Sequence, residues 1–428
     1  MSERLLVGLD VGTTAVKAAA FDHAGRELAQ GRAATPWREV PTGAEVDPGE
    51  LLDAAVAAAR EAVAAAAGGP VTGIGIASMA ETGVLLDERG EPVVPAIAWH
   101  DERGGVEAAR LAGDLPGFSA RVGLPPSALC TLAKYAWMRD HLPESERGVR
   151  WLNVAEWIVL GLGGEPAAEL SLASRTGFYD LHEQRQWDDA LAWAGAPAGL
   201  MPEAVPAGTA LGTVSDALPE AHGAVLAVGG HDHLAAAVGL GAAGEGDVLD
   251  SCGTAEAFVQ ASAPLAPEQA ARAVDGGISV GWHAVPGRQA LLGAHSSGAE
   301  LRDVLAALGL EPEQRGPIEE AALAIEHGEA GDEDARAYHA ALDHVGRAGA
   351  DILAHMAAVA AAAQRLVVTG GWAAGAAAQA VKERRLGAFE HSPALFSGGA
   401  RGGALAAGRA AGLWSVDDAP WGAVQEVT

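Results

Sequence analysis

The stretch that decides the fold reads Leu5-Leu6-Val7-Gly8-Leu9-Asp10-Val11-Gly12-Thr13-Thr14-Ala15-Val16-Lys17, near the start of the 428-residue chain. Its apolar beginning predicts a buried strand, and residues 15–21 and 27–31 predict two more strands, with a turn at 22–25 between them. A glycine beside a carboxylate and two hydroxyl groups is typical of a tight turn that lets backbone N–H groups approach an anion. The stretch therefore predicts a phosphate-binding β-hairpin. The Walker-loop motif, G-x-x-x-x-G-K-[ST], does not occur in the chain.

The tip of this hairpin supplies the candidates for phosphate contact, namely Gly12, Thr13, Thr14 and Lys17. The lysine is notable because nearly all other basic positions in the chain are arginine, and a compact ammonium suits phosphate as a point charge. Asp10 is placed to hold a hydrated Mg²⁺ ion. The alternative interpretation is an ordinary hairpin with a polar tip and a surface lysine.

Composition limits the classes of partner. The formal net charge is −28 at pH 7, which argues against nucleic acid and anionic membranes, because both favour clustered Lys and Arg. Any ATP site must then build its positive potential locally. The cysteines, Cys130 and Cys252, lie far apart and exclude a disulfide framework or a structural zinc site. The sequence shows neither a leader nor a credible membrane span, so we expect a cytoplasmic protein.

The order of segments predicts an α/β protein of two domains, 1–225 and 226–428, with a Pro- and Gly-rich connector at 194–212 before the boundary. Asp47 and Pro48 predict the N-cap and first turn of a helix over 51–67. The other predicted segments of the first half are a strand at 71–77, a strand pair at 83–86 and 93–99 around a turn at 87–90, a mostly helical region at 104–160, and a strand at 224–228 that opens the second domain.

The second half repeats the pattern of the first. Residues 247–254 read as a strand that runs into a Gly-Thr turn, formed by Gly253 and Thr254. Two such hairpins, one in each half, are able to hold one polyphosphate from two sides. Chance recurrence of Gly-Thr in a chain with 57 glycines is the alternative.

Two further segments carry candidate residues. Gly229-Gly230-His231-Asp232-His233 precedes a predicted helix at 234–240, and Asp232 is a candidate base for a hydroxyl that attacks a phosphate. The alternatives are an N-cap and a metal patch made with the neighbouring histidines. Gly370 and Gly371 end a predicted strand at 365–369, where glycines would let an adenine ring lie on the backbone; an ordinary strand–helix junction is the alternative.

In this order the segments resemble the FGGY family of carbohydrate kinases, within the actin-like ATPase superfamily. The stretches that carry the resemblance are the first hairpin, Glu45-Val46-Asp47-Pro48, residues 75–82, Trp99-His100-Asp101-Glu102-Arg103, residues 229–233, Gly253-Thr254, Ser297-Gly298-Ala299-Glu300-Leu301-Arg302, Gly370-Gly371 and Gly402-Gly403-Ala404. They cover nearly the whole chain, and their order is more specific than any one of them.

The resemblance implies two actin-like domains with a cleft between them and the ATP-dependent phosphorylation of a small neutral sugar or polyol at a primary hydroxyl, with a ketose such as xylulose as the first expectation. It implies ATP and Mg²⁺ as cofactors and Asp232 as the base. It implies that the first hairpin, Gly253 and Thr254 contact the phosphates and that Gly370 and Gly371 contact the adenosine. The residues implied to hold the substrate are Glu81, Trp99, Asp101, Arg103 and His233. Whether the chain acts alone or as a homodimer stays open.

The chain also departs from the family pattern. It is short, and the stretch after Arg302 lacks the usual L-P-x-x-x-G-E-R-x-P loop. Glycerol kinases carry Arg-Glu-Thr where this chain has Ala80-Glu81-Thr82, and xylulose kinases carry Met-His where it has Met79-Ala80. Trp372 follows the C-terminal glycine pair, where small or polar residues are usual. These departures keep open an alternative: a catalytically weak, nucleotide-dependent sugar sensor or assembly protein on the same fold.

Overall fold

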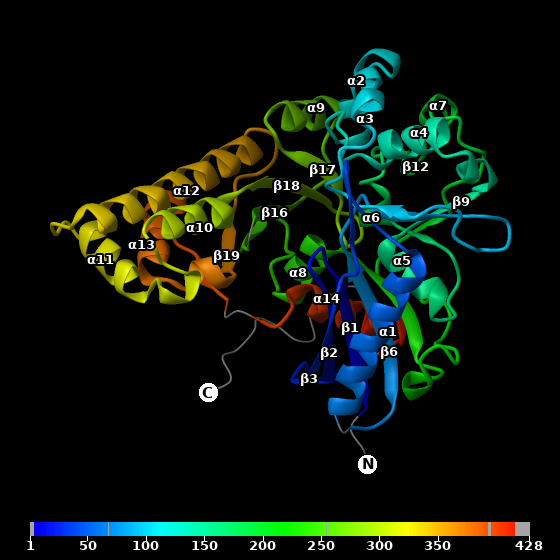
Figure 1. Ribbon diagram of the computed structural model, residues 1–428, viewed down its shortest axis with the longest axis horizontal. Helices are drawn as coiled ribbons and strands as arrows, with labels where there is room; N and C mark the ends of the chain where they lie inside the picture. The colour runs from blue at the N-terminus through cyan, green and yellow to red at the C-terminus, as the bar shows by residue number, and fades with distance from the viewer. Residues whose placement is uncertain (1–3, 67, 254, 393–394, 416–428) are drawn as a thin grey trace.

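The computed structural model describes residues 4–66, 68–253, 255–392 and 395–415. In this part of the chain two large sheets are each flanked by helices, and the first half of the sequence supplies most of one sheet while the second half supplies the other (Figure 1). The segment order is that of a mixed α/β protein, as predicted.

The first sheet carries the predicted phosphate hairpin. Among the described residues its strands are ordered β14-β6-β1-β2-β3. Their bounds are β1 (Leu5–Val11), β2 (Ala15–Asp22), β3 (Glu27–Ala34), β6 (Val71–Ser78) and β14 (Val225–His231). The hairpin β1–β2 and the pair β2–β3 are antiparallel, whereas β6 and β14 run parallel to β1. The predicted strands are confirmed, and β14 joins this first sheet although it follows the boundary that we proposed at residue 225.

Helix α1 (Pro48–Ala65) covers β2 and β3 on one face of this sheet. It begins as the sequence predicts, because the side chain of Asp47 accepts hydrogen bonds from the backbone N–H groups of Gly49 and Glu50. A buried apolar core that includes Leu9 and Ile76 fills the space beneath α1 and α5 (Val154–Gly161).

The opposite face is covered by α14 (Gly398–Ala410), which comes from the far end of the chain and packs on β1, β6 and β14. The approach is close enough to require glycine in the strands. A Cβ at Gly8 would lie 1.7 Å from the carbonyl oxygen of Ala400, and one at Gly75 would lie 1.8 Å from that of Gly403. Helix α8 (Asp232–Gly239) packs beside α14. Residues 398–410 therefore lie with the first sheet, although the proposed division assigns them to the second domain.

The rest of the first half forms smaller elements around this sheet. These are β4 (Arg38–Val40), β5 (Gly43–Val46), β7 (Gly83–Leu86), β8 (Ala96–Ile97), β9 (Arg150–Asn153), β10 (Ala168–Glu169), β11 (Tyr179–Asp180), β12 (Arg185–Gln186), β13 (Ala204–Val205), α2 (Gly105–Asp114), α3 (Phe118–Val122), α4 (Thr131–His141), α6 (Leu170–Ala173) and α7 (Asp188–Trp193). Two expectations are wrong in detail. The strand predicted at 93–99 is regular only in β8, which pairs with β5, and β9 interrupts the region predicted to be helical in order to pair with β7.

The second sheet has the order β17-β18-β16-β15-β19-β20 within the described residues. The elements of this half are β15 (Asp247–Cys252), β16 (Glu256–Ser262), β17 (Ser279–Trp282), β18 (Gln289–His295), β19 (Arg365–Thr369), β20 (Glu390–His391), α9 (Pro267–Asp275), α10 (Ser297–Ala307), α11 (Gly316–Glu326), α12 (Glu333–Ala357) and α13 (Ala376–Leu386). Strands β15 and β16 form the second antiparallel hairpin that the sequence predicts.

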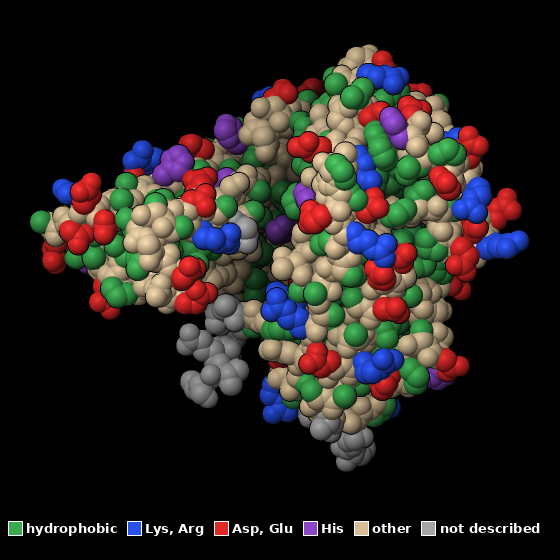
Figure 2. Space-filling view, viewed as in Figure 1, with side chains coloured by type: hydrophobic (Ala, Val, Ile, Leu, Met, Phe, Trp, Pro, Cys, Tyr) green, Lys and Arg blue, Asp and Glu red, His purple; other side chains and the backbone are tan. Residues whose placement is uncertain are grey.

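Helices α10 to α13 form an arm that extends to the left of Figure 1, and the surface is hollowed between this arm and the body of the molecule (Figure 2). Helix α11 occupies part of the stretch after Arg302 that lacks the family loop. None of the helices in the described residues has the length and apolar character needed to cross a membrane.

Candidate active site

The tip of the first hairpin is tied down by three side chains from outside it. The hydroxyl of Thr35 donates to the carbonyl of Gly12 at 2.7 Å, and the indole N–H of Trp37 donates to the carbonyl of Thr13 at 2.6 Å. The indole N–H of Trp99 donates to the hydroxyl oxygen of Thr13 at 2.8 Å. Trp99, which the resemblance implied as a substrate residue, thus contacts the phosphate hairpin. Thr35 and Trp37 were missed because nothing local in their sequence points to a partner more than twenty residues away.

Asp10 and Asp232 lie at the same edge of the first sheet. Strands β1 and β14 flank β6 and run parallel to it, with Asp10 level with Ala77 and His231 level with Ser78. Burial raises the pKa of Asp10 to about 6, and the negative charge of Asp232 adds to this rise. The fold therefore brings together two carboxylates from the ends of two strands that lie more than 200 residues apart.

Asp10 also contacts the beginning of α14. The hydroxyl of Ser397, the N-cap of that helix, donates to Oδ2 of Asp10 at 2.6 Å. A Cβ at Gly399 would lie 2.9 Å from the carboxyl carbon of Asp10. A helix N-terminus stabilises a nearby anion, so α14 helps to keep this carboxylate charged. Ser397 was missed because sequence alone does not show that α14 returns to the first strand.

Asp232 stands at the beginning of α8. Its Oδ1 accepts the backbone N–H of His233 at 2.8 Å, and Nε2 of His231 lies 3.2 Å from the same oxygen. Burial lowers the pKa of His231 well below its usual value, which keeps that ring neutral, whereas burial raises the pKa of Asp232. The side chain of Asp232 keeps 25% of its surface exposed, so the carboxylate remains accessible to a ligand. The donor atoms of these three residues lie within 4.8 Å of one another, so the metal-patch alternative stays open.

Lys17 lies opposite Asp10 in the hairpin register, and its Nζ is 5.8 Å from the ring centre of Phe396. The ammonium of Lys17 lowers the pKa of Asp10, and electrostatic interaction with His233 acts in the same direction. The structure thus brings Asp10, Lys17, Asp232 and His233 into one electrostatic group. Two neighbouring carboxylates in a partly buried site fit a divalent cation with oxygen ligands, which agrees with Asp10 as a Mg²⁺ residue.

Glu81 pairs with an arginine that the sequence did not single out. Nε of Arg175 donates to Oε1 of Glu81 at 2.6 Å, and Nη1 of Arg175 donates to the hydroxyl of Ser279 on β17 at 2.7 Å. The backbone φ of Glu81 is +61°, a strained conformation for a residue other than glycine, of the kind that clusters at functional sites. Both Glu81 and Arg175 line a cavity of about 300 Å³ between segments of the two halves.

Asp101 and Arg103, implied as substrate residues, form a buried ion pair with each other. The guanidinium of Arg103 contacts both carboxylate oxygens of Asp101 at 2.8–2.9 Å and reaches Glu45 at 2.8 Å. The second oxygen of Asp101 also accepts the backbone N–H of Ala44. These bonds lower the pKa of Asp101, although burial alone would raise it, and its side chain is fully covered. In this structure the pair fastens the loop to β5, and a substrate role for Asp101 and Arg103 stays a prediction.

The second hairpin turn lies against the Gly370 pair and the beginning of α10. A Cβ at Gly298 would lie 2.1 Å from the carbonyl oxygen of Gly253, and one at Gly370, whose φ is +105°, would lie 2.4 Å from that of Cys252. Thr254 lies outside the described residues. Among the described residues, and apart from its neighbours in the chain, no atom lies within 4 Å of a Cβ built at Gly371, so this stretch leaves room for a ring on the backbone.

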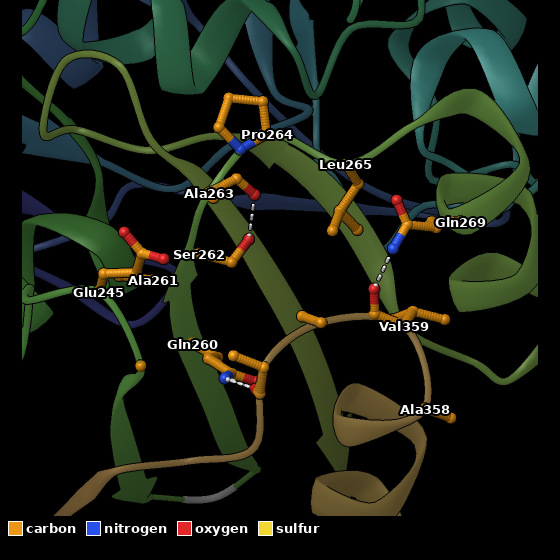
Figure 3. Close-up of a pocket in the computed structure, with 13 residues that line it drawn as sticks. Glu245, Gln260, Ala261, Ser262, Ala263, Pro264, Leu265, Gln269, Ala358 and Val359 are labelled. Atoms are coloured by element: carbon orange, nitrogen blue, oxygen red, sulfur yellow. Dashed lines mark hydrogen bonds between the residues drawn. The ribbon is translucent and has the colours of Figure 1, made fainter.

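A second cavity, of about 380 Å³, lies away from the predicted site residues, none of which lines it. Figure 3 shows how Gln260 and Gln269 close its wall. Their side-chain amides donate at 2.7 Å to the carbonyls of Ala361 and Val359. These bonds tie the loop after α12 to β16 and α9, which is a structural arrangement.

Comparison with known proteins bears on the family and the fold. Residues 5–239 match the model of the N-terminal domain of the FGGY family of carbohydrate kinases. The chain is 37% identical over 251 residues to a xylulose kinase of Streptomyces coelicolor (55% of this chain, 50% of that protein) and 32% identical over 242 residues to a glycerol kinase of Bordetella parapertussis (54% and 47%). The chain thus spans about half the length of the curated relatives that it matches.

Among solved structures, the xylulose kinase of Rhodospirillum rubrum superposes with a TM-score of 0.87 at 25% identity, covering 98% of this chain and 92% of that one. The glycerol kinase of Plasmodium falciparum with ADP gives a TM-score of 0.85 at 15% identity, covering 99% and 93%, and at that identity shows the fold alone. The predicted α/β class with two actin-like domains is confirmed. With more than half of its residues in the family match, the chain belongs to the FGGY family of carbohydrate kinases.

Proposed function

We propose that this protein transfers the γ-phosphoryl group of ATP to a primary hydroxyl of a small neutral sugar or polyol, with a ketose such as xylulose as the first candidate. The observation that carries the proposal is the meeting of Asp10, Lys17 and Asp232 at the edge of the first sheet, beside a hairpin tip held rigid by Trp37 and Trp99. Phosphoryl transfer depends on positioning and on charge neutralisation, and this group supplies both.

In this proposal Asp232 takes the proton from the hydroxyl that attacks the γ-phosphorus. The neutral His231 ring and the backbone N–H of His233 hold one oxygen of Asp232, so the carboxylate is oriented before the substrate arrives. The hairpin N–H groups, Thr13, Thr14 and Lys17 contact the phosphates. Gly253 contacts the phosphates from the other domain, and Gly370 and Gly371 receive the adenosine; a phosphate contact by Thr254 is part of the proposal, but this residue lies outside the described ones. Mg²⁺, when bound near Asp10, supplies positive charge to the transferred phosphoryl group.

The polar groups near Glu81 favour a neutral substrate. Two nitrogens of Arg175 contact the same oxygen, Oε1 of Glu81, and its Oε2 has no partner among the described residues. That free oxygen is able to accept a hydrogen bond from a substrate hydroxyl. Relatives named xylulose kinase and glycerol kinase agree with a substrate that offers several hydroxyl donors. The retention of Asp10, Lys17 and Asp232 in one group argues against the alternative of a catalytically weak sensor.

The test is ADP release by the purified protein with MgATP across ketopentoses, ketohexoses, polyols and sugar acids. The proposal expects turnover with at least one neutral ketose or polyol and none with sugar acids. Turnover with sugar acids alone would contradict the neutral-substrate assignment. If the protein binds MgADP but turns over none of these compounds, the result would support the alternative of a nucleotide-dependent sugar sensor.

Replacing Lys17 by Ala is expected to weaken MgATP about 10-fold or more and to leave sugar affinity within 2-fold, because a charge-assisted hydrogen bond to phosphate is worth about 1.5–3 kcal/mol. The measurement is the pair of KM values. Arg32→Ala is a matched control, since Arg32 is an exposed cation level with Lys17 on the next strand. Equal loss of both ligands in Lys17→Ala would instead mark Lys17 as a structural residue.

Replacing Glu81 by Ala is expected to raise the KM for the sugar about 10-fold or more while the KM for MgATP stays within 2-fold, because the proposal gives the free oxygen of Glu81 a contact with the sugar and none with the nucleotide. Glu81→Gln is the companion variant, since it keeps the side-chain shape beside Arg175 and removes only the charge. An unchanged sugar KM in both variants would place the sugar elsewhere in the cleft.

A further inference from the structure

A buried cluster of charges lies directly beneath the second hairpin turn, and the proposed mechanism does not use it. Lys382, on α13, has only 7% of its side chain exposed. Its Nζ lies 2.7 Å from Oδ2 of Asp250 on β15 and also contacts Oε1 of Glu256 on β16. Both carboxylates are fully or almost fully buried. One ammonium therefore joins the two strands of the hairpin from a helix of the arm.

Further groups complete the cluster. The thiol of Cys252 donates to Oδ1 of Asp250 at 3.2 Å, and Nε2 of His295, on β18, lies 3.4 Å from Oε2 of Glu256. Burial raises the pKa of Asp250 to about 7 despite the nearby ammonium. Although burial opposes it, the His295 hydrogen bond and the Lys382 charge lower the pKa of Glu256 to about 2. The ammonium of Lys382 thus contacts both carboxylates, Asp250 and Glu256, inside the protein.

The cluster lies next to the second hairpin turn, which suggests what it does. Asp250 and Glu256 stand three residues before and three residues after Gly253. Helix α13, which carries Lys382, follows Gly370 and Gly371, and the approach of Gly298 to Gly253 brings the beginning of α10 to the same turn. The cluster therefore joins the strands on both sides of the second turn to α13, and α10 meets the same turn at Gly298.

A buried ion pair is a costly way to gain stability, because apolar residues of similar volume often stabilise a protein equally well or better. In some proteins a buried polar or ionic group instead specifies the relative position of the segments that carry it. At this location the fixed segments are the second turn, α10 and the residues that follow β19.

We propose that Lys382, acting through Asp250 and Glu256, is a positioning residue that sets the second hairpin turn and the adjoining glycines for MgATP, without touching the nucleotide itself. The inference rests on the proposed function for the identity of the ligand. Loss of the cation leaves a buried carboxylate without its partner, and the turn then shifts relative to α13. Nucleotide affinity falls as a result, whereas the sugar site on the first domain does not change.

The test compares Lys382→Met with the wild-type protein by calorimetric titration with MgADP, which requires no turnover, and by the KM for the sugar. We expect MgADP affinity to fall about 10- to 100-fold, by analogy with the loss that follows when a partner that orients a metal ligand is removed, with the sugar KM within 2-fold. Arg385→Met is the matched control. It removes a cation from the same helix, but Arg385 pairs with Asp343 of α12 and not with the hairpin.

A triple variant, Lys382→Met with Asp250→Asn and Glu256→Gln, removes the buried carboxylate charges that Lys382→Met alone would leave unpaired. If Lys382→Met does not fold, the MgADP affinity of this triple variant tests the positioning role in its place. We expect it to recover the melting temperature and still to bind MgADP about 10-fold more weakly than the wild type. Recovery of wild-type MgADP affinity together with stability, or an equal loss of sugar and nucleotide affinity, would overturn the positioning role. Failure of the wild-type protein to bind MgADP would instead contradict the proposed function.

Discussion

Replacing Asp232 by Asn is expected to lower kcat by about 100-fold or more and to leave MgADP affinity within a few-fold. An Asn side chain keeps the oxygen that accepts the backbone N–H of His233, so the beginning of α8 is preserved. It has no basic oxygen to take the proton of the attacking hydroxyl, and a general base supplies about 10²–10⁴-fold. The measurements are steady-state turnover with the preferred sugar and calorimetric titration with MgADP.

Asp351→Asn is the control for this variant. It makes the same chemical change at an exposed position on α12, away from the site. Turnover near the wild-type level in Asp232→Asn would show that Asp232 is not the catalytic base and serves only to begin α8. The proton would then have to leave by another route.

Replacing Gly75 by Ala is expected to destabilise the protein by about 3 kcal/mol or more, the upper range for forcing extra volume into a packed core. The new Cβ would lie 1.8 Å from the carbonyl oxygen of Gly403, and this neighbour is helix backbone that cannot rotate away. Helix α14 has to shift from the sheet, which also moves Ser397 from Asp10. Activity is therefore expected to fall with stability. The measurements are chemical denaturation and turnover at a temperature where the variant stays folded.

Gly113→Ala is the matched control, because a Cβ at this position in α2 has no neighbour within 4 Å in the part of the chain that the structure describes, apart from its own helix backbone and its chain neighbours. Alanine has a higher helix propensity than glycine by about 1 kcal/mol, so this variant is expected to equal or exceed the wild type in stability. Equal stability of Gly75→Ala and the wild type would mean that α14 does not pack on the sheet as closely as described.

The parts of the fold and site that the sequence predicted are those whose signals are local. The hairpin at Asp10, the capped beginning of α1 and the second hairpin before Gly253 each depend on residues within a few positions of one another. Asp232 could be singled out for the same reason, since a glycine pair and a helix start surround it. Its proximity to Asp10 depends on β14 joining the first sheet, which local patterns do not show.

The remaining functional residues depend on contacts between distant segments. Arg175 meets Glu81 across 94 positions, and Ser397 meets Asp10 across 387, so no window of sequence joins either pair. The buried ion pair of Asp101 could not be predicted for a related reason. An aspartate close to an arginine looks the same in the sequence whether it binds a sugar or forms a buried ion pair. Only the burial of the carboxylate oxygens in the folded protein separates the two cases.

The packing of α14 has a consequence for how the protein is made. The ribosome releases β1, β6 and β14 early, yet the helix that covers their glycine-lined face emerges more than 160 residues after β14. At usual rates of synthesis this delay is on the order of ten seconds or more. During that interval the nascent chain exposes an apolar sheet face, which chaperones are able to bind and proteases to cleave. A fragment restricted to the first 240 residues is accordingly expected to aggregate when it is expressed alone.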